Sequence, residues 1–234
     1  MLGKVRRYIV GMLLLFFGSS ILAVVVYRWM PVYVTPLMII RAAQQVSRGE
    51  KIRLKHHWVS LDEEMSLYMP IAVMAGEDQL FLTHRGFDFR QIEIAMREHN
   101  NGGRLRGAST ISQQTAKNVF LWPSHSWLRK GLEVYFTCLI EIIWGKHRIM
   151  EVYLNSIETG DGIYGVDAVA QQYFMRPASD LSRANCALIA ATLPNPLKYS
   201  SKEPSAYVLR RQSWIMGQMR HIDIFPGRES FFAK

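Results

Sequence analysis

Cysteine is nearly absent from this chain of 234 residues. The sequence holds only Cys138 and Cys186, which lie far apart and form no CxxC pair. This count excludes a disulfide-stabilised scaffold and a four-cysteine zinc site. Both residues lie in apolar runs, which favours two buried free thiols over a bridge between them. The seven histidines include no HExxH motif, so a dedicated zinc site is not expected either.

Acidic residues are absent from the first thirty positions, which carry Lys4, Arg6, Arg7 and Arg28. The whole chain has 28 basic and 19 acidic residues, a formal net charge of +9. This balance suits an anionic partner, a class that includes nucleic acid, acidic lipid and phosphate. Charge alone does not choose among the three.

Charged residues are also missing from the apolar segment between Tyr8 and Tyr27. Twenty residues of helix span about 30 Å, the thickness of a bilayer's hydrocarbon core. Basic residues precede the segment, so the positive-inside rule places residues 1–7 in the cytoplasm as a short tail and exports the rest. A cleaved signal peptide is the alternative, but the run is long for one and no A-x-A-like site follows it. We therefore predict an uncleaved transmembrane anchor over residues 8–27.

The chain after the anchor divides into a connector and one domain. Residues 28–55 contain Pro31, Pro36 and scattered basic residues, which predicts a juxtamembrane connector that starts as an extended stretch. From Leu61 onward helical periodicity dominates and strand signals are few, which indicates a mainly α domain of about 180 residues. The clearest helical runs cover residues 63–83, 110–121, 128–154, 164–174 and 180–193.

Glycine interrupts the helical pattern at two places. The break at 100–103 fits either a flexible connection or a mobile flap that carries Arg104 and Arg106 beside a site. A second break follows a helix that ends near Asn155, and the turn at 160–162 leads into another helix.

The first segment with chemistry in its pattern is EDQLFLTHRGFD, residues 77–88. At helical spacing Glu77, Phe81 and His84 share one face. A carboxylate beside an aromatic ring and an imidazole is a poor core pattern, and burial there raises the pKa of the acid toward that of a general base. The alternative is a solvated helix end at which Glu77 pairs with a basic side chain.

The second segment is GASTISQQTAKN, residues 107–118. Thr110 followed three residues later by Gln113 is a capping box, so a helix begins here. Gln113 with Lys117 and Gln114 with Asn118 form i, i+4 pairs that place amides and one cation along adjoining ridges. This arrangement near a helix N-terminus suits an anion such as diphosphate, and a polar solvent-facing surface is the alternative.

Two carboxylates lie eight residues apart in the next helical run. Arg129 and Glu133 are spaced as an ordinary i, i+4 ion pair. Glu141 lies among leucines and isoleucines, so we expect a basic side chain from another segment to neutralise it.

In this order the segments resemble the motifs of the peptidoglycan glycosyltransferase family. Residues 77–88 resemble its first motif, 107–118 the second, 129–133 the third and 146–174 the fourth, and a weaker likeness to the fifth runs from 181 to 210. The larger members add a transpeptidase domain with SxxK and KTG motifs, and neither motif occurs here. The resemblance therefore points to the monofunctional branch of the family.

The resemblance implies a mainly α fold with a lysozyme-like lobe and a smaller membrane-proximal lobe, with the glycosyltransferase domain over residues 56–234. It implies that Glu77 is the catalytic base and Glu133 a second essential carboxylate. The substrate-binding positions that it implies are Asp78, Phe81, His84, Ser109, Thr110, Gln113, Gln114, Lys117, Asn118, Arg129 and Lys130. The chain departs from the family at His125, where relatives commonly carry arginine, and a largely neutral imidazole weakens the expected diphosphate contact.

The implied activity is polymerisation of lipid II into glycan strands by inverting β-1,4 transfer, on the periplasmic side of the bacterial inner membrane. The implied partners are lipid II, the growing strand, the membrane and other cell-wall synthesis proteins, without nucleic acid. No cofactor is expected to be obligatory, with Mg²⁺ or Mn²⁺ as a stimulatory ion that Glu133 could hold. A glycan-cleaving enzyme of the lysozyme type and a non-catalytic membrane scaffold are the alternatives. The cations of the second and third motifs favour synthesis.

Overall fold

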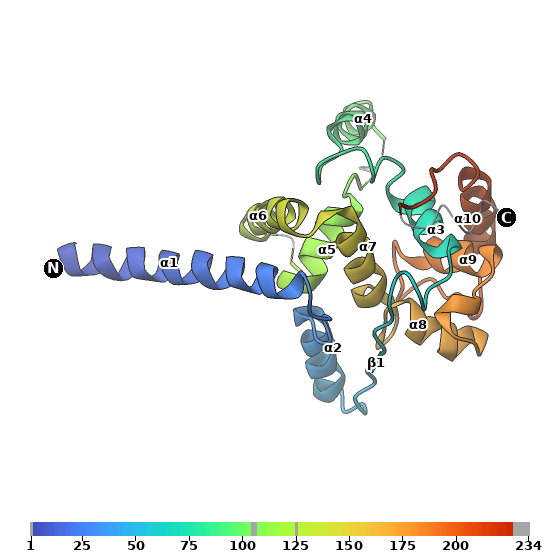
Figure 1. Cartoon of the computed structure of the whole chain (residues 1–234), viewed down its shortest axis with the longest axis horizontal. Coiled ribbons are helices and arrows are strands. Elements are labelled where there is room, and N and C mark those ends of the chain that lie inside the picture. Colours follow the sequence, from blue (N-terminus) through green and yellow to red (C-terminus); the bar gives the residue numbers. More distant parts are fainter. Residues whose placement is uncertain (1, 104–106, 125, 227–234) are drawn as a thin grey trace.

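The computed structural model describes residues 2–103, 107–124 and 126–226, and these fold mainly into helices (Figure 1). The α-helices are α1 (Leu2–Tyr27), α2 (Pro36–Ser47), α3 (Tyr68–Glu77), α4 (Phe89–Asn100), α5 (Ile111–Phe120), α6 (Trp127–Ile143), α7 (Gly145–Ser156), α8 (Val166–Val169), α9 (Arg183–Thr192) and α10 (Ala206–Gln218). A π-helical turn at Ala170–Phe174 continues α8, and a 3₁₀ turn spans Ala178–Asp180. The mainly α prediction is confirmed.

The strands are short and form one small sheet. They are β1 (Lys55–His56), β2 (Glu158–Gly160) and β3 (Ile163–Tyr164), in the order β1-β3-β2. β1 pairs with β3 in parallel, with Lys55 opposite Ile163, and β2 pairs with β3 in an antiparallel hairpin. The sheet ties the chain just after α2 to the segment that follows α7.

The N-terminal helix projects away from the rest of the molecule (Figure 1). Its segment Lys4–Tyr27 is long and apolar enough to cross a membrane. Its last turns lie against α6, where Trp144 Nε1 donates to the Val24 carbonyl at 2.7 Å. Arg148 Nη2 donates to the Tyr27 carbonyl at 3.0 Å and so satisfies a carbonyl at the C-terminal end of the helix.

Two groups of helices carry the core of the domain. α3 packs on α9, and α10 packs on both, at the end of the molecule far from α1 (Figure 1). Small side chains permit the close approach, because Gly76 faces Ala190 and Ile215 so closely that a Cβ at residue 76 would lie 3.1 Å from Ile215 Cδ1. The second group is α5 packed against α6 and α7. The candidate site lies between the two groups.

The structure corrects several boundaries expected from the sequence. The connector starts extended, as expected, but it then forms the helix α2, which the sequence did not predict, with Thr35 as N-cap and Pro36 at its first position. α4 and α10 were not among the expected helical runs. The run expected over 128–154 is two helices, broken at Gly145, whose φ is +76°.

The cysteine prediction is half right. Cys138 and Cys186 are both free, and Cys186 is buried. Cys138 is exposed, because it lies on the outer face of α6 rather than in the core.

Candidate active site

The first predicted carboxylate ends a helix rather than continuing one. Glu77 is the last residue of α3, and Asp78 leaves the helical region with φ −161° and ψ 82°. The prediction that Glu77, Phe81 and His84 share one helical face is therefore wrong. The reason is a competing partner: the Asp78 carboxylate accepts from the Ile111 N–H at 3.0 Å, at the N-terminus of α5, which turns the chain out of α3.

His84 fixes the loop that follows. Its Nδ1 accepts from the Gly86 N–H at 3.1 Å, so Nε2 carries the proton and donates to Asp78 Oδ2 at 2.9 Å. Gly86 has a φ of +91°, and a Cβ there would lie 2.9 Å from the Thr137 side chain. The Gly86 carbonyl accepts from Thr110 Oγ1 at 2.6 Å. The loop is thus joined to both α5 and α6.

Glu77 lies in a largely enclosed polar environment, with 12% of its side chain exposed. Its Oε2 accepts from Gln114 Nε2 at 3.1 Å, and its Oε1 accepts from Arg211 Nη2 at 3.2 Å. Burial raises the pKa of Glu77, and the bonds from Gln114 and Arg211 only partly offset that rise. Gln114 Oε1 accepts from the Tyr153 hydroxyl at 3.1 Å, which orients the amide with its nitrogen toward Glu77.

Arg211 is the functional residue that sequence reasoning missed. It comes from α10, and it also donates to the Gly76 carbonyl at 3.1 Å. The sequence allowed Glu77 to pair with a basic side chain, but nothing near Glu77 in the sequence identifies which one. The only available signal was the rule that an enclosed carboxylate needs a cation.

Glu133 is paired within its own helix. α6 begins at the N-cap Ser126, so Arg129 and Lys130 precede Glu133 by one turn. Glu133 Oε2 accepts from Arg129 Nη1 at 2.6 Å, and Oε1 accepts from Lys130 Nζ. Only 4% of the Glu133 side chain is exposed. The predicted i, i+4 pair is confirmed, and it is a buried pair.

Lys117 is a half-buried cation on α5, one turn after Gln114. Among the described residues its ammonium has no hydrogen bond or ion pair. Burial lowers the pKa of Lys117, the neighbouring cations Arg129 and Lys130 lower it further, and Glu133 opposes them. A cation in this position favours an anionic ligand.

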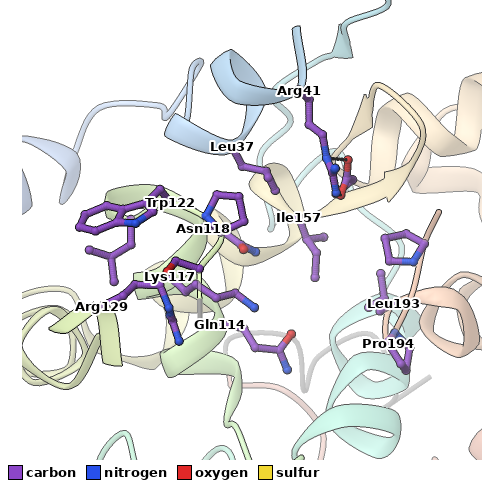
Figure 2. A pocket seen from close by; sticks show the side chains of 15 residues that line it. Leu37, Arg41, Gln114, Lys117, Asn118, Trp122, Arg129, Ile157, Leu193 and Pro194 are labelled. Atoms are coloured by element: carbon purple, nitrogen blue, oxygen red, sulfur yellow. Dashed lines mark hydrogen bonds and ion pairs between the residues drawn. The ribbon is translucent and has the colours of Figure 1, made fainter. Parts of the chain in front are cut away.

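A cleft of about 460 Å³ lies beside these groups (Figure 2). Gln114, Lys117 and Asn118 of α5 line it together with Arg129 of α6. Figure 2 shows Lys117 and Arg129 on one side of the cleft and α2 across from them. The rest of the lining is largely apolar and includes Trp122, Ile157, Leu193 and Pro194.

The other predicted site residues lie around the cleft rather than on its surface. Phe81 is fully buried, with Lys146 Nζ 4.5 Å from its ring centroid. Thr110 and Gln113 are buried in the predicted capping box. Ser109 is exposed, and Lys130 is half-buried. Arg104, Arg106 and His125 lie outside the described residues.

Glu141 has the basic partner that its apolar neighbours required. Lys146 Nζ donates to Glu141 Oε1 at 2.6 Å, and Ser112 Oγ donates to the same oxygen. The pair joins α6, α7 and α5 behind the cleft.

The carboxylates near the cleft do not fit a metal held by the protein. Each oxygen of Glu133 already accepts from a cation, and the positive charges of Arg129 and Lys130 oppose the binding of a metal ion there. No group of three or more His, Cys, Asp or Glu side chains comes together within residues 2–103, 107–124 and 126–226.

Known proteins are similar to this chain over most of its length. The family model described as Transglycosylase matches residues 43–220. A biosynthetic peptidoglycan transglycosylase of Bacteroides thetaiotaomicron is 59% identical over 223 residues, which are 95% of this chain and 90% of the relative. Relatives of the same description from Bdellovibrio bacteriovorus and Pseudomonas syringae pv. syringae are 51% and 49% identical. Those matches cover 92% and 95% of this chain and 85% and 94% of the relatives.

Proposed function

The chain belongs to the transglycosylase family, and we propose that this peptidoglycan glycosyltransferase polymerises lipid II into glycan strands. One observation carries the proposal. Gln114 bonds to the enclosed carboxylate of Glu77 and also lines the cleft that holds Lys117 and Arg129. The candidate base is therefore one hydrogen bond from a residue of the cavity that the two cations line, and glycosyl transfer from a lipid diphosphate requires such a base and such cations close together.

Glu77 acts on the acceptor, the 4-hydroxyl of the GlcNAc of lipid II. A sugar hydroxyl is a feeble nucleophile near neutrality, so its proton must leave as the oxygen attacks. The raised pKa of Glu77 makes it a stronger base than an exposed glutamate, while Arg211 at 3.2 Å keeps the carboxylate form populated. The proton passes from the hydroxyl to Glu77 as the new bond forms to C1 of the donor MurNAc.

Lys117 and Arg129 act on the leaving group. The bond between C1 and the lipid diphosphate breaks with inversion, so an α-linked donor gives a β-1,4 product. Negative charge grows on the departing diphosphate, and the Lys117 ammonium has no other ion-pair partner among the described residues. Each well-placed cation lowers such a barrier by about 3 kcal/mol.

Glu133 holds the cations rather than a metal. Its bonds to Arg129 and Lys130 restrain both side chains beside the cleft. Any stimulation by Mg²⁺ or Mn²⁺ then comes from ions held by the diphosphate of the substrate, because two cations already neutralise this carboxylate.

The anchor places the cleft near its lipid-linked substrate. α1 can cross a membrane, and its contacts with Trp144 and Arg148 favour an anchor that is retained rather than cleaved. The positive-inside rule assigns the N-terminus to the cytoplasm and the domain to the periplasmic face of the inner membrane. We expect no transpeptidase activity, because the chain lacks SxxK and KTG motifs.

The test uses detergent-purified full-length protein, labelled lipid II and a gel that resolves glycan strands. Wild type gives a ladder, Glu77→Gln gives none, and Glu50→Gln, an exposed carboxylate on the connector, matches wild type. Shortening of preformed strands without growth would instead indicate a glycan-cleaving enzyme. Neither reaction in any variant would indicate a scaffold.

A further inference from the structure

Helix α2 forms one wall of the cleft although it belongs to the segment that joins the anchor to the domain. Met38 and Gln45 bury one side of the helix, and α2 packs against α5. Leu37 and Arg41, one turn apart, line the cleft. The connector therefore contributes side chains to the same cavity as Lys117.

Arg41 fastens this wall to the sheet. Its Nε donates to Glu158 Oε1 at 3.0 Å and its Nη2 donates to Glu158 Oε2 at 3.1 Å, a bidentate pair. Glu158 is buried on β2, with 7% of the residue exposed. A buried carboxylate with a bidentate arginine is costly to separate, so the pair fixes where α2 lies. We call this ion pair the α2 clasp.

The two walls of the cleft differ in chemistry. Lys117 and Arg129 present cations from α5 and α6, whereas α2 presents Leu37 across from them, next to Arg41, which Glu158 neutralises (Figure 2). The Trp122 ring also lines the cleft. A polyprenyl diphosphate has the same division, since its charged group is joined directly to an apolar chain. The cations suit the diphosphate, and the apolar side chains suit the first isoprene units.

We propose that Arg41 is a positioning residue for the lipid diphosphate: through the α2 clasp it holds Leu37 over the cleft, against the isoprene units next to the diphosphate. This inference rests on the proposed function. Arg41 itself remains paired with Glu158 and does not bind the phosphates. Its loss therefore weakens binding of the lipid and leaves the catalytic groups in place.

The test separates the lipid from the phosphates. Arg41→Ala is titrated with undecaprenyl diphosphate in detergent micelles and, separately, with inorganic diphosphate. We expect the Kd for the lipid diphosphate to rise about tenfold and that for inorganic diphosphate to stay within about twofold. In the polymerisation assay KM for lipid II rises by a similar factor while kcat changes by less than about twofold. Arg41→Lys keeps the charge but loses the bidentate geometry, so its values fall in between.

The matched control is Arg48→Ala. Arg48 forms an exposed pair with Glu50 at the end of the same helix, and its removal should leave every value at the wild-type level. Hydrogen exchange gives a readout independent of turnover, because amides 37–47 should exchange faster in Arg41→Ala and not in Arg48→Ala.

The outcomes separate this inference from the proposed function. Equal weakening for lipid and inorganic diphosphate would make Arg41 a direct phosphate ligand and overturn the positioning role. Unchanged KM, Kd and exchange would overturn the α2 clasp as a working part of the site. The wild type could fail to polymerise lipid II while Arg41→Ala still binds the lipid diphosphate more weakly than wild type does. In that case the α2 clasp stands and the polymerase proposal falls.

Discussion

Two largely buried carboxylates lie close to residues that line the cleft, and their surroundings differ. Glu77 is joined to one guanidinium at 3.2 Å and one neutral amide at 3.1 Å, and burial raises its pKa. Glu133 is joined to two cations from its own helix, one of them at 2.6 Å. Loosely paired carboxylates can take a proton during a reaction, whereas tightly paired ones fix the charges around them. The contrast predicts different tasks for the two glutamates.

The largest expected effect comes from removing the base. Glu77→Gln keeps the size of the side chain but cannot accept a proton, so kcat for lipid II polymerisation should fall about 10³-fold. The pKa of Glu77 is raised in the folded state, so ionising this carboxyl costs stability. The free energy of unfolding therefore falls as the pH rises through that pKa. The neutral amide avoids this cost. The variant should therefore melt at or above the wild-type temperature at pH 7, and residual kcat within tenfold of wild type would remove Glu77 from the chemistry.

Glu133→Gln should behave differently on both measurements. The amide leaves Arg129 and Lys130 without a counter-charge, so the free energy of unfolding should fall by about 2 kcal/mol, a value reduced for the partial exposure of Lys130. The rate of polymerisation should fall about 10²-fold. The loss is smaller than for Glu77→Gln because the cations are misplaced while the base remains. Thermal melts and lipid II assays of both glutamine variants give the comparison directly. Equal melting temperatures for the two variants would show that the two carboxylates do not differ in what they contribute to stability.

The same contrast explains what the sequence could predict. Arg129 and Lys130 precede Glu133 by four and three residues, so spacing alone predicted the ion pair between Arg129 and Glu133. The capping box of Thr110 and Gln113 is equally local, and it is confirmed. Helical geometry fixes such distances in advance.

Long-range partners could not be predicted in this way. Glu77 is hydrogen-bonded to Gln114 and Arg211, which lie 37 and 134 positions further along the chain. Arg41 of α2 is hydrogen-bonded to Glu158, 117 positions away. The helix was expected to continue through His84, but the Ile111 N–H drew the Asp78 carboxylate across the fold. Which basic side chain pairs with Glu77 depends on how α10 packs, and no local sequence pattern encodes that packing.

The pH profile provides an intermediate test. The proposed role of Glu77 needs its ionised form, so kcat/KM should rise with pH through the raised pKa of that group. Removing the guanidinium in Arg211→Gln should raise that pKa further and move the acidic limb to higher pH. The proposed role of Lys117 needs its protonated form, so its lowered pKa should bring the alkaline limb to lower pH. Lys117→Arg should move only the alkaline limb, upward, and a shift of the acidic limb in that variant would contradict the assignment.

The smallest expected effect concerns the orientation of one amide. The Tyr153 hydroxyl donates to Gln114 Oε1 at 3.1 Å, which leaves Nε2 to donate to Glu77. Tyr153→Phe removes that hydroxyl, and Gln114 can then turn its oxygen toward the carboxylate, where it repels the charge. We expect kcat to fall about fivefold, in keeping with one neutral hydrogen bond of about 1 kcal/mol. In the part of the chain that the structure describes, no hydrogen bond joins Tyr153 to Glu133, so the double variant Tyr153→Phe with Glu133→Gln should show the product of the two losses. Tyr153→Phe with Gln114→Ala should lose no more than Gln114→Ala alone, because the amide that the hydroxyl orients is already gone. A further loss in that second double variant would show that Tyr153 acts on Glu77 by another route.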